Sequence, residues 1–176
     1  WLVLMLLGAL LCTAPQLSRA QTCRILIFDF QDTAGSGSGS WAGAALAGAL
    51  VDILGPESPA CSAVPQMVVR HHDPLGTLPF ERKWELVDAM AAQAFVEGSY
   101  HMKNGGMEFT GTLVKPVDND IRDISFTLES YTFNAALAAL ADRVAAAFNT
   151  TVSTESGTTM GTPSADAHRA YWQAAT

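Results

Sequence analysis

The sequence has little positive charge. It contains 10 Lys and Arg residues against 17 Asp and Glu residues, a formal net charge of −7, and its basic residues nowhere form a run. Nucleic acid carries a negative backbone that proteins bind through Lys and Arg, so a polyanion is a poor partner for this surface. We therefore expect no nucleic-acid partner.

Long apolar runs are also scarce. The apolar run at the start ends at Leu11, short of the roughly 18 to 20 residues that span a bilayer. Residues 1–20, WLVLMLLGALLCTAPQLSRA, turn from apolar to polar and end in small residues around Arg19, which is typical of a secretory signal peptide. We expect residues 1–20 to be cleaved, leaving a secreted or periplasmic protein without a stable membrane span. Retention of the segment and association with the outer membrane stay open.

Cysteine is rare, with three residues in the chain. Removal of the signal peptide takes Cys12 away and leaves Cys23 and Cys61, an even pair that an oxidising compartment would join in a disulfide. Two separate buried thiols are the alternative. The spacing of this pair does not match a zinc site, and we expect neither a metal nor a cofactor.

What the sequence does contain is apolar material, 49% of the residues, in an alternation of predicted strands and helices. The class predicted is α/β, a mixed β-sheet with helices packed on it, in the order β-α-β-α-β-β-β-α. Ser40 is the expected N-cap of the first helix, and Pro79 opens the second. The predicted segments are strand 24–30, helix 41–54, strand 66–70, helix 80–94, a hairpin over 95–114, strand 124–129 and helix 133–149.

The hairpin, FVEGSYHMKNGGMEFTGTLV, is the most regular part of the chain. Gly98 is expected to allow close backbone packing, and Gly105 with Gly106 to form the turn. Alternation places Met107, Phe109, Gly111 and Leu113 toward the core and Glu108, Thr110 and Thr112 toward water. The predicted core residues are Phe109, Leu113, Phe126, Leu137 and Phe148.

A Gly/Ser loop, GSGSGSWAGAAL at 35–46, contains Gly37, Gly39 and Ala42 in the spacing of a dinucleotide motif. Four residues separate it from the preceding strand, and Asp29 and Asp32 put negative charge beside the supposed anion site. A flexible loop is the favoured interpretation, and nucleotide binding is the alternative.

Histidines offer little chemistry. His71, His72 and Asp73 are possible zinc ligands, but adjacent side chains on an extended segment point to opposite sides, so a polar turn is favoured. His101, expected on the wet face of the hairpin, and His168 have no nucleophile placed beside them by the sequence. We predict no catalytic residue and no enzymatic activity.

The composition also divides the chain. Residues 21–149 form the predicted domain, and 150–163, TTVSTESGTTMGTP, have the composition of a flexible linker. Residues 164–176 regain helix-forming residues, and we expect them to begin a helical region that continues further.

Four segments, ILIFDFQDT, FVEGSY, GGMEFTGTLV and FNAALAALADRVAAAF, resemble the TolB N-terminal-like domain family, which is related to curli-secretion and flagellar outer-membrane assembly domains. The resemblance covers residues 24 to about 149. It implies a mixed sheet with helices on its faces and a role in contacts between envelope proteins. The loop QDTAGSGSGS departs from the Asn and Ser-Gly-Asp turn of many relatives, so no loop function is carried over.

The segment ADAHRAYWQA is similar to the first helix of a tetratricopeptide array, which often follows this family. We therefore predict a non-enzymatic domain for interaction and assembly of envelope proteins, with the partner unidentified. The alternatives are a ligand- or nucleotide-binding module that uses the Gly/Ser loop, and an accessory domain of a signalling protein.

Overall fold

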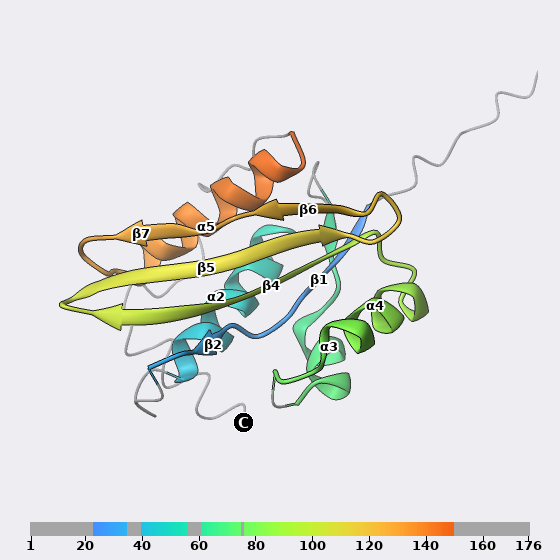
Figure 1. Ribbon diagram of the computed structural model, residues 1–176, viewed down its shortest axis with the longest axis horizontal. Coiled ribbons are helices and arrows are strands. Elements are labelled where there is room, and N and C mark those ends of the chain that lie inside the picture. The colour runs from blue at the N-terminus through green and yellow to red at the C-terminus, as the bar shows by residue number, and fades with distance from the viewer. Residues whose placement is uncertain (1–22, 35–39, 56–60, 75, 150–176) are drawn as a thin grey trace, which may run out of the picture.

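The computed structural model describes residues 23–34, 40–55, 61–74 and 76–149 (Figure 1). Its elements are β1 (Arg24–Ile27), β2 (Gln31–Asp32), α2 (Ser40–Ile53), β3 (Ser62–Ala63), α3 (Gln66–His72), α4 (Phe80–Ala89), β4 (Ala94–Lys103), β5 (Gly106–Lys115), β6 (Asp120–Asp123), β7 (Phe126–Leu128) and α5 (Phe133–Ala147). The strands form one sheet with the order β3-β1-β4-β5-β6, in which β2 also pairs with β4 and β7 with β5. The predicted α/β class with a mixed sheet is confirmed.

The sheet is parallel at one side and antiparallel at the other. β1 pairs in parallel with both β3 and β4, whereas β4, β5 and β6 pair antiparallel. The first three apolar residues of β1, Ile25, Leu26 and Ile27, have no exposed surface. A strand that is apolar on both faces needs cover on both, which explains why β1 occupies an inner position between two layers of helices.

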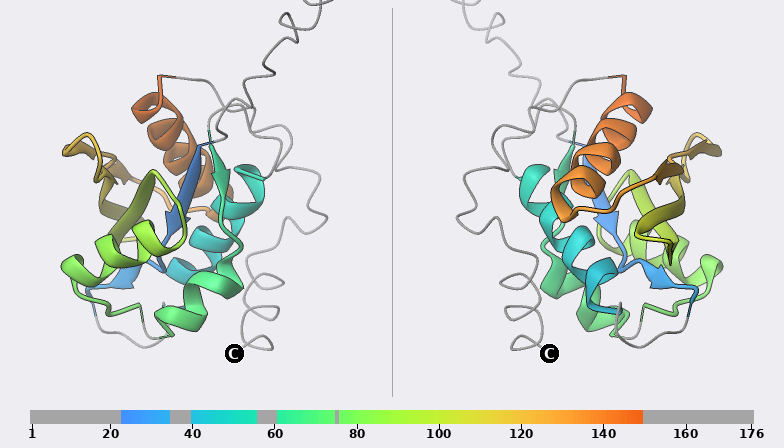
Figure 2. Two further views of the ribbon diagram at one scale, coloured as in Figure 1. Left: turned by 90° about the vertical axis from the view of Figure 1, so that its right-hand side faces the viewer. Right: turned by 90° about the vertical axis from the view of Figure 1, so that its left-hand side faces the viewer.

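Helices lie on both faces of the sheet (Figure 2). α2 and α5 pack against each other and against one face of the sheet, and together they bury the larger core cluster. α3 and α4 lie on the other face and bury a smaller cluster that includes Leu26, Phe95 and Val114. We call these the covered face and the open face of the sheet, because the second layer ends before the hairpin does.

The turn of the hairpin is two residues long. Asn104 and Gly105 both have positive φ, 53° and 79°, as a type I′ turn requires. Gly106 lies one residue later, in β5 opposite Lys103, where an added Cβ would collide with the carbonyl oxygen of Leu128. The prediction that Gly105 and Gly106 form the turn is therefore wrong for Gly106, which serves a close approach of the backbone, while Asn104 takes the other turn position.

Gly98 and Gly43 also mark close approaches. A Cβ on Gly98 would lie 2.8 Å from Cζ of Phe109, the ring that fills the covered face at this point. A Cβ on Gly43, in the first turn of α2, would collide with the carbonyl oxygen of Phe30. The small residues at the start of α2 thus bring this helix directly onto the chain that follows β1.

The predicted strand 66–70 is wrong, because these residues form α3. The strand lies a few residues earlier, at Ser62–Ala63, and Pro65 then begins the helix with φ −52°, a value that suits a helix start. Helical spacing brings Gln66 and Arg70 to one side, where both bind Asp29. These contacts outweigh the strand preference of Val68 and Val69.

Three boundaries also differ from the prediction. Residues 31–32 form the short strand β2, and 120–128 form two strands, β6 and β7, that both pair with β5. α4 ends at Ala89, so Ala91, with φ 49°, lies beyond the helix. The expected segments 1–20, 150–163 and 164–176 lie outside the described residues.

Candidate interaction surface

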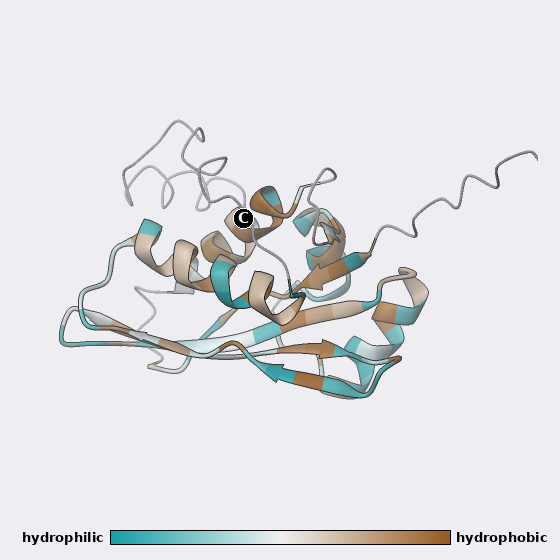
Figure 3. Cartoon of the chain, turned by 90° about the horizontal axis from the view of Figure 1, so that it is seen from above, coloured by the Kyte–Doolittle hydropathy of each residue, from teal (hydrophilic) through white to brown (hydrophobic). Residues whose placement is uncertain are grey.

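The open face of the hairpin is the main candidate site. Beyond the first turn of α4, where Lys83 lies, the side chains on this face of β4 and β5 are polar and reach water, and Figure 3 shows the sheet nearly edge-on with helices along its other side. Ser99 pairs with Thr110 and His101 with Glu108 across the two strands. Thr127 of β7 and Asp123 of β6 extend the surface through their pairing with Glu108 and Thr112. These residues, Ser99, His101, Glu108, Thr110, Thr112, Asp123 and Thr127, define the open-face patch.

One carboxylate of the patch is held in its charged form. Asp123 accepts hydrogen bonds from the Ser125 hydroxyl at 2.5 Å and from the Ser125 backbone N–H at 3.0 Å. Both bonds lower the pKa of Asp123 below its ordinary value of 3.8, and the bond from the hydroxyl has the larger effect. The patch therefore keeps a negative charge at its β6 side even in mildly acidic surroundings.

Closer to α4, the helix covers the open face and excludes water from it. Nζ of Lys83 donates to Oε2 of Glu97 at 2.6 Å and lies 4.9 Å from the ring centroid of Phe28. The Lys83 side chain is only 11% exposed, so this ion pair attaches α4 to β4 under a partial apolar cover. Glu97 thus marks the boundary between the covered half of this face and the patch.

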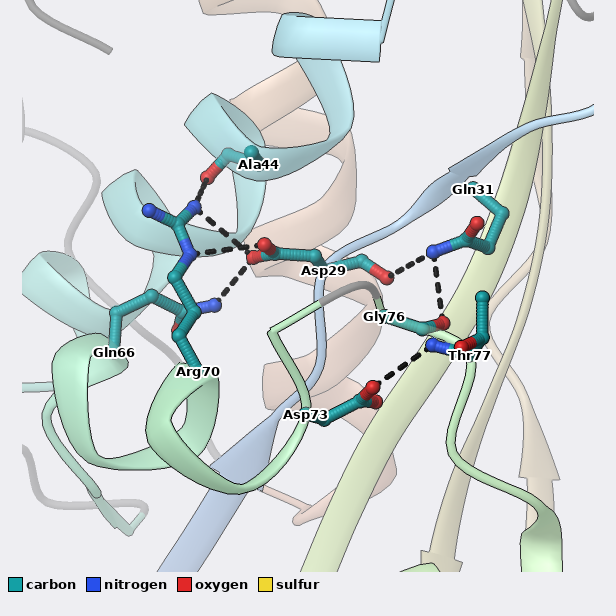
Figure 4. A network of polar contacts seen from close by, with 8 residues as sticks. All are labelled: Asp29, Gln31, Ala44, Gln66, Arg70, Asp73, Gly76 and Thr77. Carbon is teal, nitrogen blue, oxygen red and sulfur yellow. Dashed lines mark hydrogen bonds and ion pairs between the residues drawn. The ribbon is translucent and has the colours of Figure 1, made fainter. Parts of the chain in front are cut away.

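A polar network fixes α3 at the end of β1 (Figure 4). Asp29 accepts from Nε2 of Gln66 at 2.6 Å, from Nε of Arg70 at 2.9 Å and from the Arg70 guanidinium again at 3.1 Å. The guanidinium also reaches the carbonyl oxygen of Ala44 in α2 at 3.4 Å. Both oxygens of Asp29 are thus engaged by protein groups, and the arrangement suits a structural junction between β1, α2 and α3.

The loop after α3 is organised by Asp73. Its carboxylate accepts the backbone N–H groups of Thr77 at 2.8 Å and Leu78 at 3.2 Å, and the residue is 5% exposed. His71 and His72 are exposed in the last turn of α3, and not in the polar turn that we expected. Asp73 therefore shapes a loop and does not share a ligand set with them. In residues 23–34, 40–55, 61–74 and 76–149, no three metal-ligating side chains converge.

Cys23 and Cys61 are joined in a disulfide, with their Cα atoms 4.5 Å apart. Cys61 belongs to the core under the covered face, whereas Cys23 is half-buried. Cys23 also lines a groove of about 540 Å³ at the end of the sheet, together with Ala92, Gln93, Lys115, Val117 and Phe148 among others. Val117, at the rim, is 87% exposed.

Tyr100 lies buried on the covered face, beside Gly43 of α2. Burial, and then the nearby charge of Asp32, raise the pKa of Tyr100 to about 12. Asp32 itself accepts the backbone N–H of Ala34 at 2.8 Å. The loop residues 35–39 lie outside the described residues, so the favoured flexible loop stays a prediction and nucleotide binding stays its alternative.

The predicted core residues all belong to the core between the covered face and its helices. Phe109 is 2% exposed and Leu113 fully buried, while Phe126, Leu137 and Phe148 are partly buried and pack against the same cluster. The Phe109 ring stacks on Phe126 with centroids 5.0 Å apart and meets Phe30 edge-on at 4.9 Å.

The junction of Asp29 with Arg70 was not predicted from the sequence. Its only signal was a carboxylate placed at the end of an apolar strand.

In the part of the chain that the structure describes, no helix is long and apolar enough to cross a membrane. No family model matches the sequence, and no curated protein matches it either.

Solved structures give faint likenesses. The lipoprotein GNA1162 from Neisseria meningitidis aligns with a TM-score of 0.44 and 13% identity, over 60% of this chain and 79% of that one. A PelC dodecamer from Paraburkholderia phytofirmans aligns with a TM-score of 0.44 and 10% identity, over 74% of this chain and 89% of that one. Likenesses this faint assign neither a family nor an activity, and the resemblance to TolB N-terminal-like domains stays a prediction.

Proposed function

We propose that this chain is a non-enzymatic interaction and assembly domain of the cell envelope, and that it binds a partner protein through the open-face patch. The observation that carries the proposal is the unequal cover of the sheet. The hairpin continues beyond α4 with one face packed against α2 and α5 and the other lined by polar, solvent-reaching side chains.

The patch suits a protein partner in its chemistry. Ser99, Thr110 and Thr127 offer hydroxyl groups that both donate and accept, and Glu108 and Asp123 add negative charge. The surface is held in one conformation by continuous strand pairing from Phe95 to Lys103, so little conformational entropy is lost when it docks. Neither a metal nor a cofactor has a role in this function.

The compartment and the family are parts of the same proposal. A disulfide between Cys23 and Cys61 fits a secreted or periplasmic protein, because such bonds persist in oxidising compartments. The proposed relation to TolB N-terminal-like domains, with a tetratricopeptide region after residue 164, would place the domain among other envelope components.

Site-specific photo-cross-linking tests the proposal. p-Benzoylphenylalanine is introduced in place of His101, within the patch, and separately in place of Asp142, an exposed residue of α5 on the opposite side of the molecule. We expect a discrete cross-linked adduct from position 101 in native cells and none from position 142. Equal adducts from both positions, or none from position 101, would contradict an interface on the open face.

A further inference from the structure

The edge strand β3 is held to its neighbour by few bonds. It is two residues long and pairs only with β1 among the described strands. The N–H of Ser62 donates to the carbonyl of Cys23 at 2.8 Å, and the N–H of Val64 donates to that of Ile25 at 2.9 Å. The N–H of Ala63, between them, turns the other way, to the carbonyl of Leu54. These two backbone hydrogen bonds lie at the two ends of a pairing that covers two residues of each strand.

The disulfide stands at the end of that pairing. Cys23 directly precedes β1 and Cys61 directly precedes β3, so the bond joins the same end of two parallel neighbours. A covalent link at this point keeps Ser62 and Val64 opposite their acceptors, which a two-residue strand does weakly by itself. The disulfide thus adds a covalent restraint to the burial of Cys61 and Val64, which flank β3 and are 2% and 1% exposed.

The two cysteines differ in exposure. Cys61 is 2% exposed within the core, whereas Cys23 is half-buried and lines the groove beside Ala92, Gln93 and Phe148. An attacking thiolate must reach one of the sulfur atoms, and access is one of the factors that set the rate of exchange. The groove gives a small reductant its approach to the Cys23 side of the bond.

We propose that the Cys23–Cys61 disulfide is a redox-sensitive cross-link that holds β3 against β1, and that its reduction releases β3 while the remaining strands stay paired. A thiolate of a dithiol reductant forms a bond with Sγ of Cys23. The bridge breaks, and Sγ of Cys61 leaves with the electron pair and takes up a proton. The second thiol of the reductant then displaces Cys23 as a thiolate, which is also protonated. The protein gains two electrons and two protons, and the dithiol becomes a cyclic disulfide.

Release of β3 changes the edge of the sheet. The carbonyl groups of Cys23 and Ile25 lose their donors, and β1 becomes the outermost strand. An unpaired strand edge is the surface to which an extended segment of another chain adds. The oxidised protein keeps this edge closed, and the reduced protein presents it.

NMR of the isotope-labelled full chain, before and after dithiothreitol, tests whether reduction of the disulfide releases β3. We expect loss of the cross-strand contacts between Arg24 and Ser62 and between Ile25 and Ala63, which report β1 against β3. The contacts of Ile25 with Ala94 and of Leu26 with Phe95, on the inner side of the same strand, should keep their intensity.

A Cys23→Ser/Cys61→Ser variant should reproduce the reduced spectrum without any reductant, which separates the effect of the bond from the effect of dithiothreitol. Persistence of the contacts between β1 and β3 after complete reduction would show that β3 stays paired without the disulfide. Loss of the contacts between β1 and β4 as well would show that the bond holds the whole domain. Either result overturns the proposal.

Discussion

The two faces of the central hairpin are built from the same two strands and have opposite characters. On the covered face, Tyr100, Met107 and Phe109 are at most 2% exposed beneath α2 and α5. On the open face, His101 and Glu108 alternate with them along the same strands and reach water. Because successive residues of a strand point to opposite sides, one sequence can meet both needs. The comparison suggests that stability resides in the covered face and contacts in the open one.

The largest effect is expected at Phe109. Its ring packs between Phe30 and Phe126, so Phe109→Ala should lower the free energy of unfolding by about 3 to 5 kcal/mol, through lost burial and a cavity. The shift of the urea midpoint at constant m-value measures this loss. A loss below about 1 kcal/mol would break the comparison, because the covered face would then contribute little.

Because Tyr100 is buried on the covered face, the free energy of unfolding should depend on its ionisation at high pH. A raised pKa means that the folded state favours the neutral phenol, so this stabilisation is complete below about pH 10 and is lost as the pH rises toward about 12. Its size is roughly 2 to 3 kcal/mol, from the shift between the two values. Urea midpoints across this range should fall in the wild type and fall less in Tyr100→Phe. Equal slopes for the two proteins would contradict the assignment.

Glu97 sharpens the comparison within the open face. Glu97→Ala leaves Lys83 with a largely buried charge and no carboxylate, which should cost about 1 to 3 kcal/mol. Glu108→Ala removes the same chemical group from the same face of the hairpin, but from an exposed position, and should cost less than about 0.5 kcal/mol. Denaturation of the two variants side by side measures the contrast. Equal costs would mean that α4 does not divide this face.

How much of this could be predicted from the sequence depends on the range of the interactions involved. The hairpin follows local rules, namely strict alternation and glycine at the turn, so its faces and the α/β class were accessible, although the turn lies at Asn104-Gly105 and not at Gly105-Gly106. The helix at 66–72 was missed, because its contacts run to Asp29, well away in the sequence, and only the fold brings these groups together. Local propensity gave Val68 and Val69 to a strand, and tertiary contacts overrode it.

The candidate site shows the same division. The polar identity of Glu108 and Thr110 was visible in the sequence, since alternation assigns each residue to a face. The extent of the patch was not visible, because it depends on where α4 begins and on the ion pair between Lys83 and Glu97. The placement of Asp123 beside the hairpin likewise required the pairing of β6 with β5.

The most direct test of the account combines stability and contact at Thr110, the neighbour of Phe109 on the opposite face. Thr110→Arg is introduced into the chain that carries the photo-cross-linker at position 101. We predict that the free energy of unfolding, measured by urea denaturation, stays within about 0.5 kcal/mol of the parent's value. We also predict loss of the cross-linked adduct. Unfolding of the variant would show that this face belongs to the core. A stable variant with an undiminished adduct would show that the open-face patch is not where the partner binds.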